Sequence, residues 1–535
     1  MKKRIFMIIT AAMLMLSGCS SFDNASDLEA TTGEENAQAS MQQTLVLSMR
    51  VPETLNPLLN RDASVDQALK LVFMPLVSLG ENGKVEPSIA QSWAMSEDGR
   101  TLSLTLRDDL YWHNGAKVTA DDVAFSFRTI LSAPEDSVYA HVADYVSSVS
   151  SAGESALTVT FHDSFSKNMA ALCFPVIPES YYSGQTEPGS EVNMRAVGCG
   201  PYQMESYTMA SSMILTAYEP YFTEQPSISR VEVKITSGEE TDLYSFNQGI
   251  LDVLATDASS AGRYTAQNDD VQAYAYGGNV YDFIGFNFHR DLFQSKTLRQ
   301  SVAYAVPKEY IWESVYLQNA DMTNTPISPV SWLYEENVAP YNYDPNMSAT
   351  LLKNDGWSDA DGNGTLEKIN EAGSLQTLQI TILVNEENTG RKQIASRLAE
   401  ELKAIGFAVT VDRQPFEIYQ QKFESGDYDL VVAGWQTSYV TDLRDFFATD
   451  GNYNYIGYSN EEIDALLESA AHSVTDGQIL LAYSNLQKKL AEELPYISIA
   501  YRQNVVLTSD RVGGEITPTG ANIWNGIEHW TLRTE

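Results

Sequence analysis

The chain has 535 residues, and its 71 Asp and Glu outweigh 34 Lys and Arg, which gives a formal net charge of −37. This excess of acid argues against binding to nucleic acid, which needs basic surface for the phosphates, and against direct docking on anionic lipid. The length exceeds what one small core can hold and predicts a large folded body.

The N-terminus has the parts of a secretion signal. Residues 1–4 (MKKR) are cationic, IFMIITAAMLML is a short apolar run, and LSGC ends at Cys19. The run is too short to span a membrane comfortably, so residues 1–18 are predicted to be a signal peptide. Leu-Ser-Gly-Cys resembles a lipobox, in which the Cys19 thiol is acylated and becomes the first mature residue. An ordinary signal peptide with a chance cysteine, or a single membrane anchor, is the alternative.

Residues 19–43 are rich in Ser, Asp, Glu, Ala, Thr, Asn and Gln and hold almost no large apolar side chains. Such a segment cannot form a core, and we expect a flexible, lipid-anchored linker. The protein is therefore expected outside the cytoplasm, anchored to the cell membrane as a lipoprotein. No later apolar run is long enough for a transmembrane helix.

The first folded elements follow in chain order. TLVLSMR, residues 44–50, predicts a strand, and TLSLTLR, residues 101–107, alternates leucines with polar residues as a half-buried strand does. WHNG then supplies Asn-Gly for a tight turn. Thr119 precedes ADDVAFSFRTIL, with Asp122 three residues later, which predicts a capped helix. Pro134 lies just past that helix and ends it.

Beyond Cys19, the sequence has one further pair of cysteines, Cys173 and Cys199. In an oxidising compartment this even pair is compatible with a disulfide. Two buried thiols that behave as small hydrophobes are the alternative.

A strand–helix–strand unit is predicted in the C-terminal half. LQITILV (residues 378–384) is typical of a buried strand, and RKQIASRLAEELKAI (residues 391–405) carries an apolar helical stripe that ends before Gly406. FAVTV is the second strand, so the short loops predict a right-handed unit with a parallel sheet. A third strand, DLVVAG, ends at Gly434. Ligands bind beyond the carboxyl ends of such strands, which points to WQTSYVTDLRDFF, residues 435–447.

The block VEPSIAQSWAMSEDGRTLSLTLRDDLYWHNGAKVTADDVAFSF, residues 85–127, carries the most specific signal. It closely resembles the signature of the large extracytoplasmic solute-binding proteins of peptide- and nickel-type ABC importers. ETLNPLLN, GCGPY, FIGFNFHRDLFQSKTLRQSVAYAVPKEYI and YSNEEIDALLESA continue the resemblance in the family's order. It implies an α/β, two-lobed fold of the periplasmic-binding-protein type II-like class, of the large cluster with an extra subdomain in the first lobe.

The resemblance also implies how the chain is divided. Lobe I is expected to comprise residues 44–78, 200–282 and 505–535, its extra subdomain residues 79–199, and lobe II residues 283–504. FIGFNF leads into lobe II and SIAYRQNVVLTS leads out of it. Two crossing segments of this kind form a hinge that can close the lobes on a ligand.

In family members that bind peptides, the segment equivalent to Gly434–Trp435–Gln436 hydrogen-bonds the extended peptide backbone, which is strand addition. An acidic residue three positions past the Trp pairs with the peptide amine, and this chain has Ser438 there. Either Asp442 or Asp445 takes over, or the ligand has no free amine at that point.

Further ligand-binding candidates are mostly aromatic. Trp435 and Tyr439 are interpreted as pocket walls, with core packing as the alternative. Tyr139 matches a family position that faces the ligand, and Tyr281 lies just before the hinge, although a structural role suits both. Arg391 could hold a carboxylate of the ligand, and a solvated helix end is the alternative.

DADGNGTLE resembles the first half of a calcium loop, with Asp359, Asp361 and Asn363 at its positions one, three and five. Asn370 stands at the twelfth position, where a bidentate Glu is needed, so an acidic surface turn is the better interpretation. No metal and no cofactor are expected. Hydrolase, zinc-protease and phosphate-loop motifs are absent, which predicts a protein that is not an enzyme.

The resemblance implies a monomeric receptor that captures a peptide-like ligand by lobe closure and delivers it to the permease subunits of an ABC importer, whose separate ATPases supply the work. The same scaffold could instead bind an oligosaccharide or another non-peptide solute, which the Ser at position 438 would favour. A surface hydrolase and a signalling receptor without a transporter of its own are the remaining alternatives.

Overall fold

A computed structural model describes residues 43–266, 268, 270–369, 373–437 and 442–533. The segment from Thr44 to the C-terminus forms one compact unit. The predicted signal peptide and Cys19 lie outside the described residues, as do Ser438 and Tyr439. None of the helices in the described part of the chain combines the length and apolarity needed to cross a lipid bilayer.

Two four-stranded sheets build the first lobe. In one, β1 and β10 are parallel and β9 and β8 follow antiparallel; the other has the order β4-β5-β7-β6 and is antiparallel throughout. The strands are β1 (Thr44–Met49), β8 (Tyr202–Thr208), β9 (Ser212–Ala217), β10 (Arg230–Ile235), β4 (Ala90–Met95), β5 (Thr101–Leu106), β6 (Val146–Ser151) and β7 (Ala156–Phe161).

Short helices and two small hairpins complete this lobe. They are α2 (Ala63–Leu69), α3 (Ala120–Ser132), α4 (Val142–Tyr145), η1 (Ala170–Leu172), α5 (Glu179–Tyr182), α6 (Glu239–Asn247), α7 (Ala258–Thr265) and η4 (Ile527–His529), with β2 (Val77–Leu79) paired to β3 (Val85–Pro87) and β20 (Val512–Gly514) paired to β21 (Trp530–Leu532).

The local predictions for this lobe are confirmed. β5 alternates buried leucines with exposed residues. Gly115 of the Asn-Gly turn has a φ of +84°, a conformation that suits glycine. At the start of α3, the Asp122 carboxylate accepts from the Thr119 backbone N–H at 2.9 Å, as in a capping box.

A seven-stranded mixed sheet lies at the centre of the second lobe and extends into the first. Its order is β11-β19-β12-β18-β16-β17, with β13 paired to β19. The strands are β11 (Val253–Asp257), β12 (Val271–Phe286), β13 (Ala320–Met322), β16 (Gln379–Asn385), β17 (Ala408–Gln414), β18 (Leu430–Gln436) and β19 (Tyr496–Ser509), and β14 (Glu367–Ile369) and β15 (Leu375–Thr377) form a separate hairpin.

The helices of this lobe follow in chain order. They are η2 (Asp291–Gln294), α8 (Lys296–Tyr304), α9 (Lys308–Tyr310), η3 (Ile311–Val315), α10 (Pro345–Asn354), α11 (Thr389–Ala404), α12 (Phe416–Ser425), α13 (Arg444–Phe447), α14 (Glu461–Ala471) and α15 (Asp476–Glu493).

The predicted strand–helix–strand unit is confirmed as β16, α11 and β17. The two strands pair in parallel, and β18 joins β16 in parallel on the other side. The apolar stripe of α11 buries Ile394, Leu398 and Leu402 against this sheet. Gly406 follows the helix with a φ of +100°, which agrees with the predicted helix stop.

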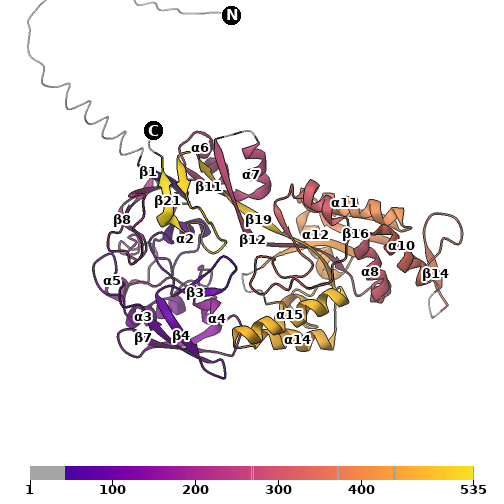
Figure 1. The fold of residues 1–535 in the computed structure, drawn as a ribbon, viewed down its shortest axis with the longest axis horizontal. Coiled ribbons are helices and arrows are strands. Elements are labelled where there is room, and N and C mark those ends of the chain that lie inside the picture. Colours follow the sequence, from indigo (N-terminus) through magenta and orange to yellow (C-terminus); the bar gives the residue numbers. More distant parts are fainter. Residues whose placement is uncertain (1–42, 267, 269, 370–372, 438–441, 534–535) are drawn as a thin grey trace, which may run out of the picture. The chain divides into compact units, whose positions relative to one another are not determined.

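Two large apolar cores correspond to the two lobes. One surrounds the first lobe's sheets and draws in the C-terminal hairpin; the other is built from residues between Tyr281 and Tyr501. β12 and β19 pair antiparallel and run from one lobe into the other (Figure 1). They are the two crossing segments of the fold, and their pairing shifts register between Gly277 and Val280.

A buried carboxylate ties β12 and β19 to the second lobe. Asp282 of β12 is fully buried and pairs with Arg502 of β19 at 2.6 Å and with Arg391 of α11 at 2.9 Å. The Tyr316 hydroxyl donates to the same carboxylate at 2.9 Å. Three elements that are distant in sequence therefore meet on one charge, which water does not solvate.

The cysteine pair is not bridged. Cys173 and Cys199 are free thiols, Cys173 partly buried and Cys199 buried, so the alternative of two separate thiols is the one observed. Burial raises the pKa of each thiol to about 12, which makes both poor nucleophiles.

The GCGPY turn packs against the WHNG turn. A Cβ on Gly198 would meet the Val72 carbonyl oxygen at 2.0 Å, so only glycine fits this close approach. The His113 ring bridges the turn: Nδ1 accepts from the Gly198 N–H at 3.3 Å and Nε2 donates to the Gly200 carbonyl at 3.1 Å. The neutral ring therefore satisfies both backbone groups.

We predict that His113 makes stability fall in acid. Burial lowers its pKa from 6.5 to about 4, partly opposed by the Gly200 hydrogen bond. As the pH falls, the unfolded chain therefore binds a proton at His113 before the folded protein does. The contribution of the neutral ring to the free energy of unfolding is complete above pH 6.5 and is lost as the pH falls toward 4. Between pH 7.5 and 4.5, urea unfolding should show wild type losing about 2 kcal/mol more than His113→Gln. Equal losses would contradict the assignment, and the exposed His162→Gln should behave as wild type.

We also predict that Asp282→Asn destabilises the protein. The substitution leaves two guanidinium groups without their shared counter-charge, so the free energy of unfolding should fall by about 3 kcal/mol in urea titrations followed by circular dichroism. Asp108→Asn, on an exposed residue, is the matched control. A loss for Asp282→Asn no larger than that of the control would show that the network is dispensable.

Candidate ligand-binding site

A cavity of about 410 Å³ lies where the two lobes meet, and we call it the junction cavity. The crossing strands supply part of its wall, and loops of both lobes supply the rest. Its lining includes Glu81, Asn82, Tyr276, Asn279, Asp321, Ser328, Val330, Thr437, Tyr501, Gln503 and Gly520. A cavity walled by both lobes and by the segments that join them changes shape when the lobes move.

A larger groove of about 1060 Å³ adjoins the junction cavity within the first lobe, and we call it the lobe I groove. The two share Glu81, Asn82 and Gly520. The other residues of the groove include Asp66, Lys70, Tyr139, His141, Asp144, Tyr145, Lys167, Cys173, Trp524 and Glu528. Together they provide room for an extended solute with both polar and aromatic contacts.

Tyr139 is the sequence-predicted residue that lines the lobe I groove. Its hydroxyl donates to Asp66 at 2.8 Å, and Asp66 also pairs with Lys70 at 3.0 Å. Burial and the neighbouring Asp66 raise the pKa of Tyr139 well above its usual range, so the phenol stays protonated. Its ring is therefore held in a fixed place in the groove wall.

The segment Gly434–Trp435–Gln436 is the end of β18, next to the junction cavity. The Trp435 ring is half-buried among aromatic rings and lies 5.1 Å from Phe446 and 5.8 Å from Phe423, centroid to centroid. It lines neither of the two cavities. Thr437, the first residue after β18, lines the junction cavity.

Gly434 has a packing role. A Cβ at this position would meet Arg391 Nη2 at 2.1 Å and Asp282 Oδ1 at 2.6 Å. On its other edge, β18 pairs with β16 only through Leu430, Val431 and Val432, so residues 433–436 have no strand partner on that side among the described residues. An extended ligand backbone could add there.

Two candidate ligand residues are structural instead. Tyr281 is 2% exposed and shares a hydrogen bond of 2.6 Å with the Ser498 hydroxyl inside the second core. Arg391 sits at the start of α11 as predicted, but its guanidinium is engaged by Asp282. Neither a buried phenol nor a paired guanidinium is available to a ligand, so we correct both assignments.

Asp442 is also engaged. Arg444 binds its two carboxylate oxygens, with Nη2 at 2.7 Å from Oδ2 and Nε at 3.1 Å from Oδ1. Burial pushes the pKa of Asp442 up, but the hydrogen bonds from Arg444 and the charge of Lys167 outweigh burial and leave the pKa lowered. Its charge is therefore already compensated.

The calcium-like segment forms an acidic turn. The Asp359 carboxylate accepts from the Gly362 and Gly364 backbone N–H groups at 2.8 and 3.0 Å. Asp361 and Glu367 have carboxylate oxygens close to it, while the Asn363 side chain bonds Asp361. Asn370 lies outside the described residues. These bonds shape an acidic turn in which the carboxylate oxygens of Asp359, Asp361 and Glu367 lie within 4.8 Å of one another.

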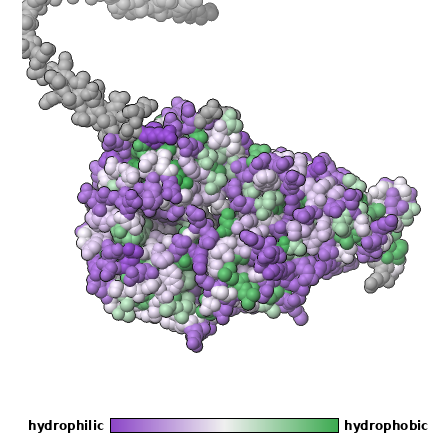
Figure 2. Space-filling model, viewed as in Figure 1, coloured by the Kyte–Doolittle hydropathy of each residue, from purple (hydrophilic) through white to green (hydrophobic). Residues whose placement is uncertain are grey.

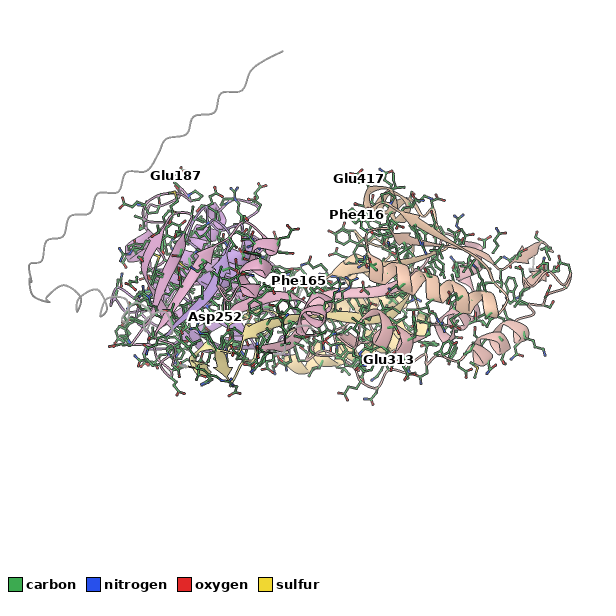
Figure 3. The ribbon with its side chains drawn as sticks, turned by 90° about the horizontal axis from the view of Figure 1, so that it is seen from above. Phe165, Glu187, Asp252, Glu313, Phe416 and Glu417 are labelled. Atoms are coloured by element: carbon green, nitrogen blue, oxygen red, sulfur yellow. The ribbon has the colours of Figure 1, made fainter. Side chains whose placement is uncertain are left out.

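The lobes also touch away from the crossing strands. Phe165 of the first lobe lies between the lobes in Figure 3, with its ring 5.1 Å from the ring of His472. The Ser166 N–H donates to the Ala471 carbonyl at 2.7 Å, and Lys84 pairs with Asp476 at 2.8 Å. The face of the unit shown in Figure 2 is mostly hydrophilic, and its apolar residues form small separate groups.

Sequence reasoning missed most of the cavity lining. Asn279, Asp321, Tyr501 and Gln503 lie on or beside the crossing strands, which were predicted as a hinge and not as a wall. The signal that could have found them is topological, because segments that join two lobes must border the cleft between them.

Comparison with known proteins gives the family. The family model described as "Bacterial extracellular solute-binding proteins, family 5 Middle" matches residues 84–456. The oligopeptide-binding protein AppA of Bacillus subtilis is 24% identical over 551 residues, covering 99% of each chain. Heme-binding protein A of Haemophilus influenzae is 23% identical and covers 98% of this chain and 99% of its own.

A solved structure shares the fold. HbpA2 from Haemophilus parasuis superposes with a TM-score of 0.75 at 19% identity, over 92% of this chain and 100% of its own. The family match extends over more than half of the sequence. The chain therefore belongs to the bacterial extracellular solute-binding proteins of family 5, the peptide/nickel group that serves ABC importers.

Proposed function

We propose that this protein is the lipid-anchored substrate-binding protein of an ABC importer and that it captures oligopeptides or dipeptides by lobe closure. The observation that carries the proposal is the junction cavity, because both lobes and both crossing strands contribute to its lining. A solute in this cavity contacts both lobes at once. Such a solute binds the closed state more tightly and so raises its population.

Several features support a peptide as the ligand. The edge of β18 that β16 leaves unpaired offers backbone groups to an extended chain, and Thr437, the first residue after β18, lines the cavity. The named relative AppA is an oligopeptide-binding protein, whereas another relative binds heme. An oligosaccharide or another non-peptide solute on the same scaffold is therefore the alternative that the ligand test must separate.

The proposed delivery step uses the closed form of the receptor. The closed receptor docks on the permease, whose ATPase subunits supply the work, and the protein itself acts as a monomer. Acylation of Cys19 would hold the body at the membrane through the acidic linker, outside the cytoplasm. The proposed lobe I comprises residues 44–78, 200–282 and 505–535, its extra subdomain residues 79–199, and lobe II residues 283–504. The hinge is proposed to lie where β12 and β19 pass from one lobe to the other.

The ligand class is tested on protein purified without refolding. Native mass spectrometry should show co-purified peptide masses, and a peptide library should raise the melting temperature. Hexose ladders, heme or bound nickel would support the alternative. A protein that carries none of these and shows no thermal shift with peptides would defeat the peptide assignment.

A cavity-filling substitution tests the site. Val330 is 44% exposed and borders the junction cavity beside Gly277. Val330→Trp should fill the cavity and weaken binding at least about tenfold by isothermal calorimetry, with stability changed by only about 0.5 kcal/mol. Val51→Trp, 60% exposed and outside both cavities, is the control. Unchanged affinity in Val330→Trp would place the ligand elsewhere.

A further inference from the structure

One acidic side chain in the junction cavity has no counter-charge. Asp321 is the middle residue of β13 and lies directly opposite Tyr501 of β19. Opposed residues of an antiparallel pair project to the same face of the sheet, and both side chains line the cavity. The backbone of two paired strands therefore fixes the position of the Asp321 carboxylate.

The hydrogen bonding of this carboxylate is incomplete. Oδ1 accepts from the Gln503 side-chain amide at 2.7 Å. Oδ2 is buried and has no hydrogen-bond partner among the described residues. Burial raises the pKa of Asp321, and the bond from Gln503 offsets only part of that effect. A buried carboxylate with a free oxygen is unfavourable unless a cation or donor reaches it.

The cationic side chains near Asp321 in sequence or structure bond other groups. Among the described residues, Glu81 and Asp321 are the only charged ones in the lining of the junction cavity. Arg502, next to Tyr501 in sequence, pairs with Asp282. Lys308 donates to Asn324 at 2.8 Å. Among the described residues no cation lines the cavity or bonds Asp321, so a ligand can supply the positive charge.

A second polar atom in the same cavity is also without a partner. The Ser328 hydroxyl is buried and makes no hydrogen bond to the described residues. A primary ammonium carries three donors, and its charge suits a carboxylate as its main acceptor with a hydroxyl as another.

We propose that Asp321, assisted by Ser328, binds a protonated amine of the ligand in the junction cavity. This assignment rests on the proposed receptor function and narrows its ligand class to solutes with a free amine, such as peptides with an unblocked N-terminus. Asp321 supplies a carboxylate for the ligand's amine, which Ser438, at the position three past Trp435, cannot supply. Asp442 is the weaker candidate because Arg444 already binds both of its oxygens.

The first experiment measures what the protein carries. Ligand that co-purifies with the wild-type protein is released by denaturation, treated with acetic anhydride and weighed by mass spectrometry. We expect it to gain acetyl groups, and Asp321→Asn should yield at least about tenfold less of it. Asp442→Asn is the matched control and should retain its ligand.

The second experiment uses defined probes. A mixture of di- to pentapeptides and the same mixture after N-acetylation are titrated into ligand-free wild type, Asp321→Asn and Asp442→Asn. Acetylation should weaken binding to wild type and to Asp442→Asn by about 100-fold, and the Asp321→Asn protein should discriminate less than about threefold. The substituted amide oxygen can still accept from Gln503, so the melting temperature of ligand-free Asp321→Asn should not fall.

The outcomes separate the two levels of the proposal. Equal binding of free and acetylated peptides, or loss of discrimination in Asp442→Asn alone, would overturn the role of Asp321 and leave the peptide receptor intact. A co-purified ligand that gains no acetyl group would overturn the amine assignment but not solute binding. A wild-type protein that carries and binds no solute would overturn both.

Discussion

The pairing of β12 with β19 is the constraint on which the rest of the structure depends. These two strands leave one apolar core and enter the other, so the position of each lobe is set by the same hydrogen-bonded ribbon. On the second-lobe side the ribbon is fixed by Asp282, which is fully buried and bound by two guanidinium groups. Toward the first lobe, the register shift after Gly277 interrupts the regular ladder. The ladder also shifts register between Asp282 and Phe283, at the clamped carboxylate, so the stretch between these two irregularities is where we expect the ribbon to bend.

The same ribbon explains why the cavity lies where it does. Residues of β12 and β19 wall the space between the lobes, and loops from each lobe close the sides. Charges follow one pattern: Asp282 and Asp442 are paired with arginines inside the protein, whereas Asp321 is not. The paired carboxylates stabilise the fold, and the unpaired one is left for a cationic group of the ligand. Acidic residues are abundant throughout the chain, so this distinction comes from their partners and not from their number.

Much of the fold could be predicted from sequence because it follows from residue patterns within short segments. Alternating leucines predicted β5, and the Thr119–Asp122 cap predicted the start of α3. The apolar stripe on α11, with Gly406 after it, predicted the strand–helix–strand unit with parallel strands. The site could be predicted less well, because it is formed by residues that are distant in sequence. Tyr281 and Arg391 were expected to face the ligand, and both proved to be occupied by partners that no local pattern reveals. Asp321 carries no motif, and its environment appears only when β13 is paired with β19.

Distance measurements across the cleft test the closing of the two lobes most directly. Glu187 and Glu417 are exposed and lie on opposite lobes in Figure 3, so Glu187→Cys and Glu417→Cys accept dyes, while Cys199 is buried, Cys173 is partly buried, and both thiols have raised pKa values. With Cys19→Ser in the same chain, single-molecule energy transfer reports the separation of the lobes. We predict that a bound ligand shortens this distance and increases the population of the short-distance state. A distance distribution that saturating ligand leaves unchanged would contradict it.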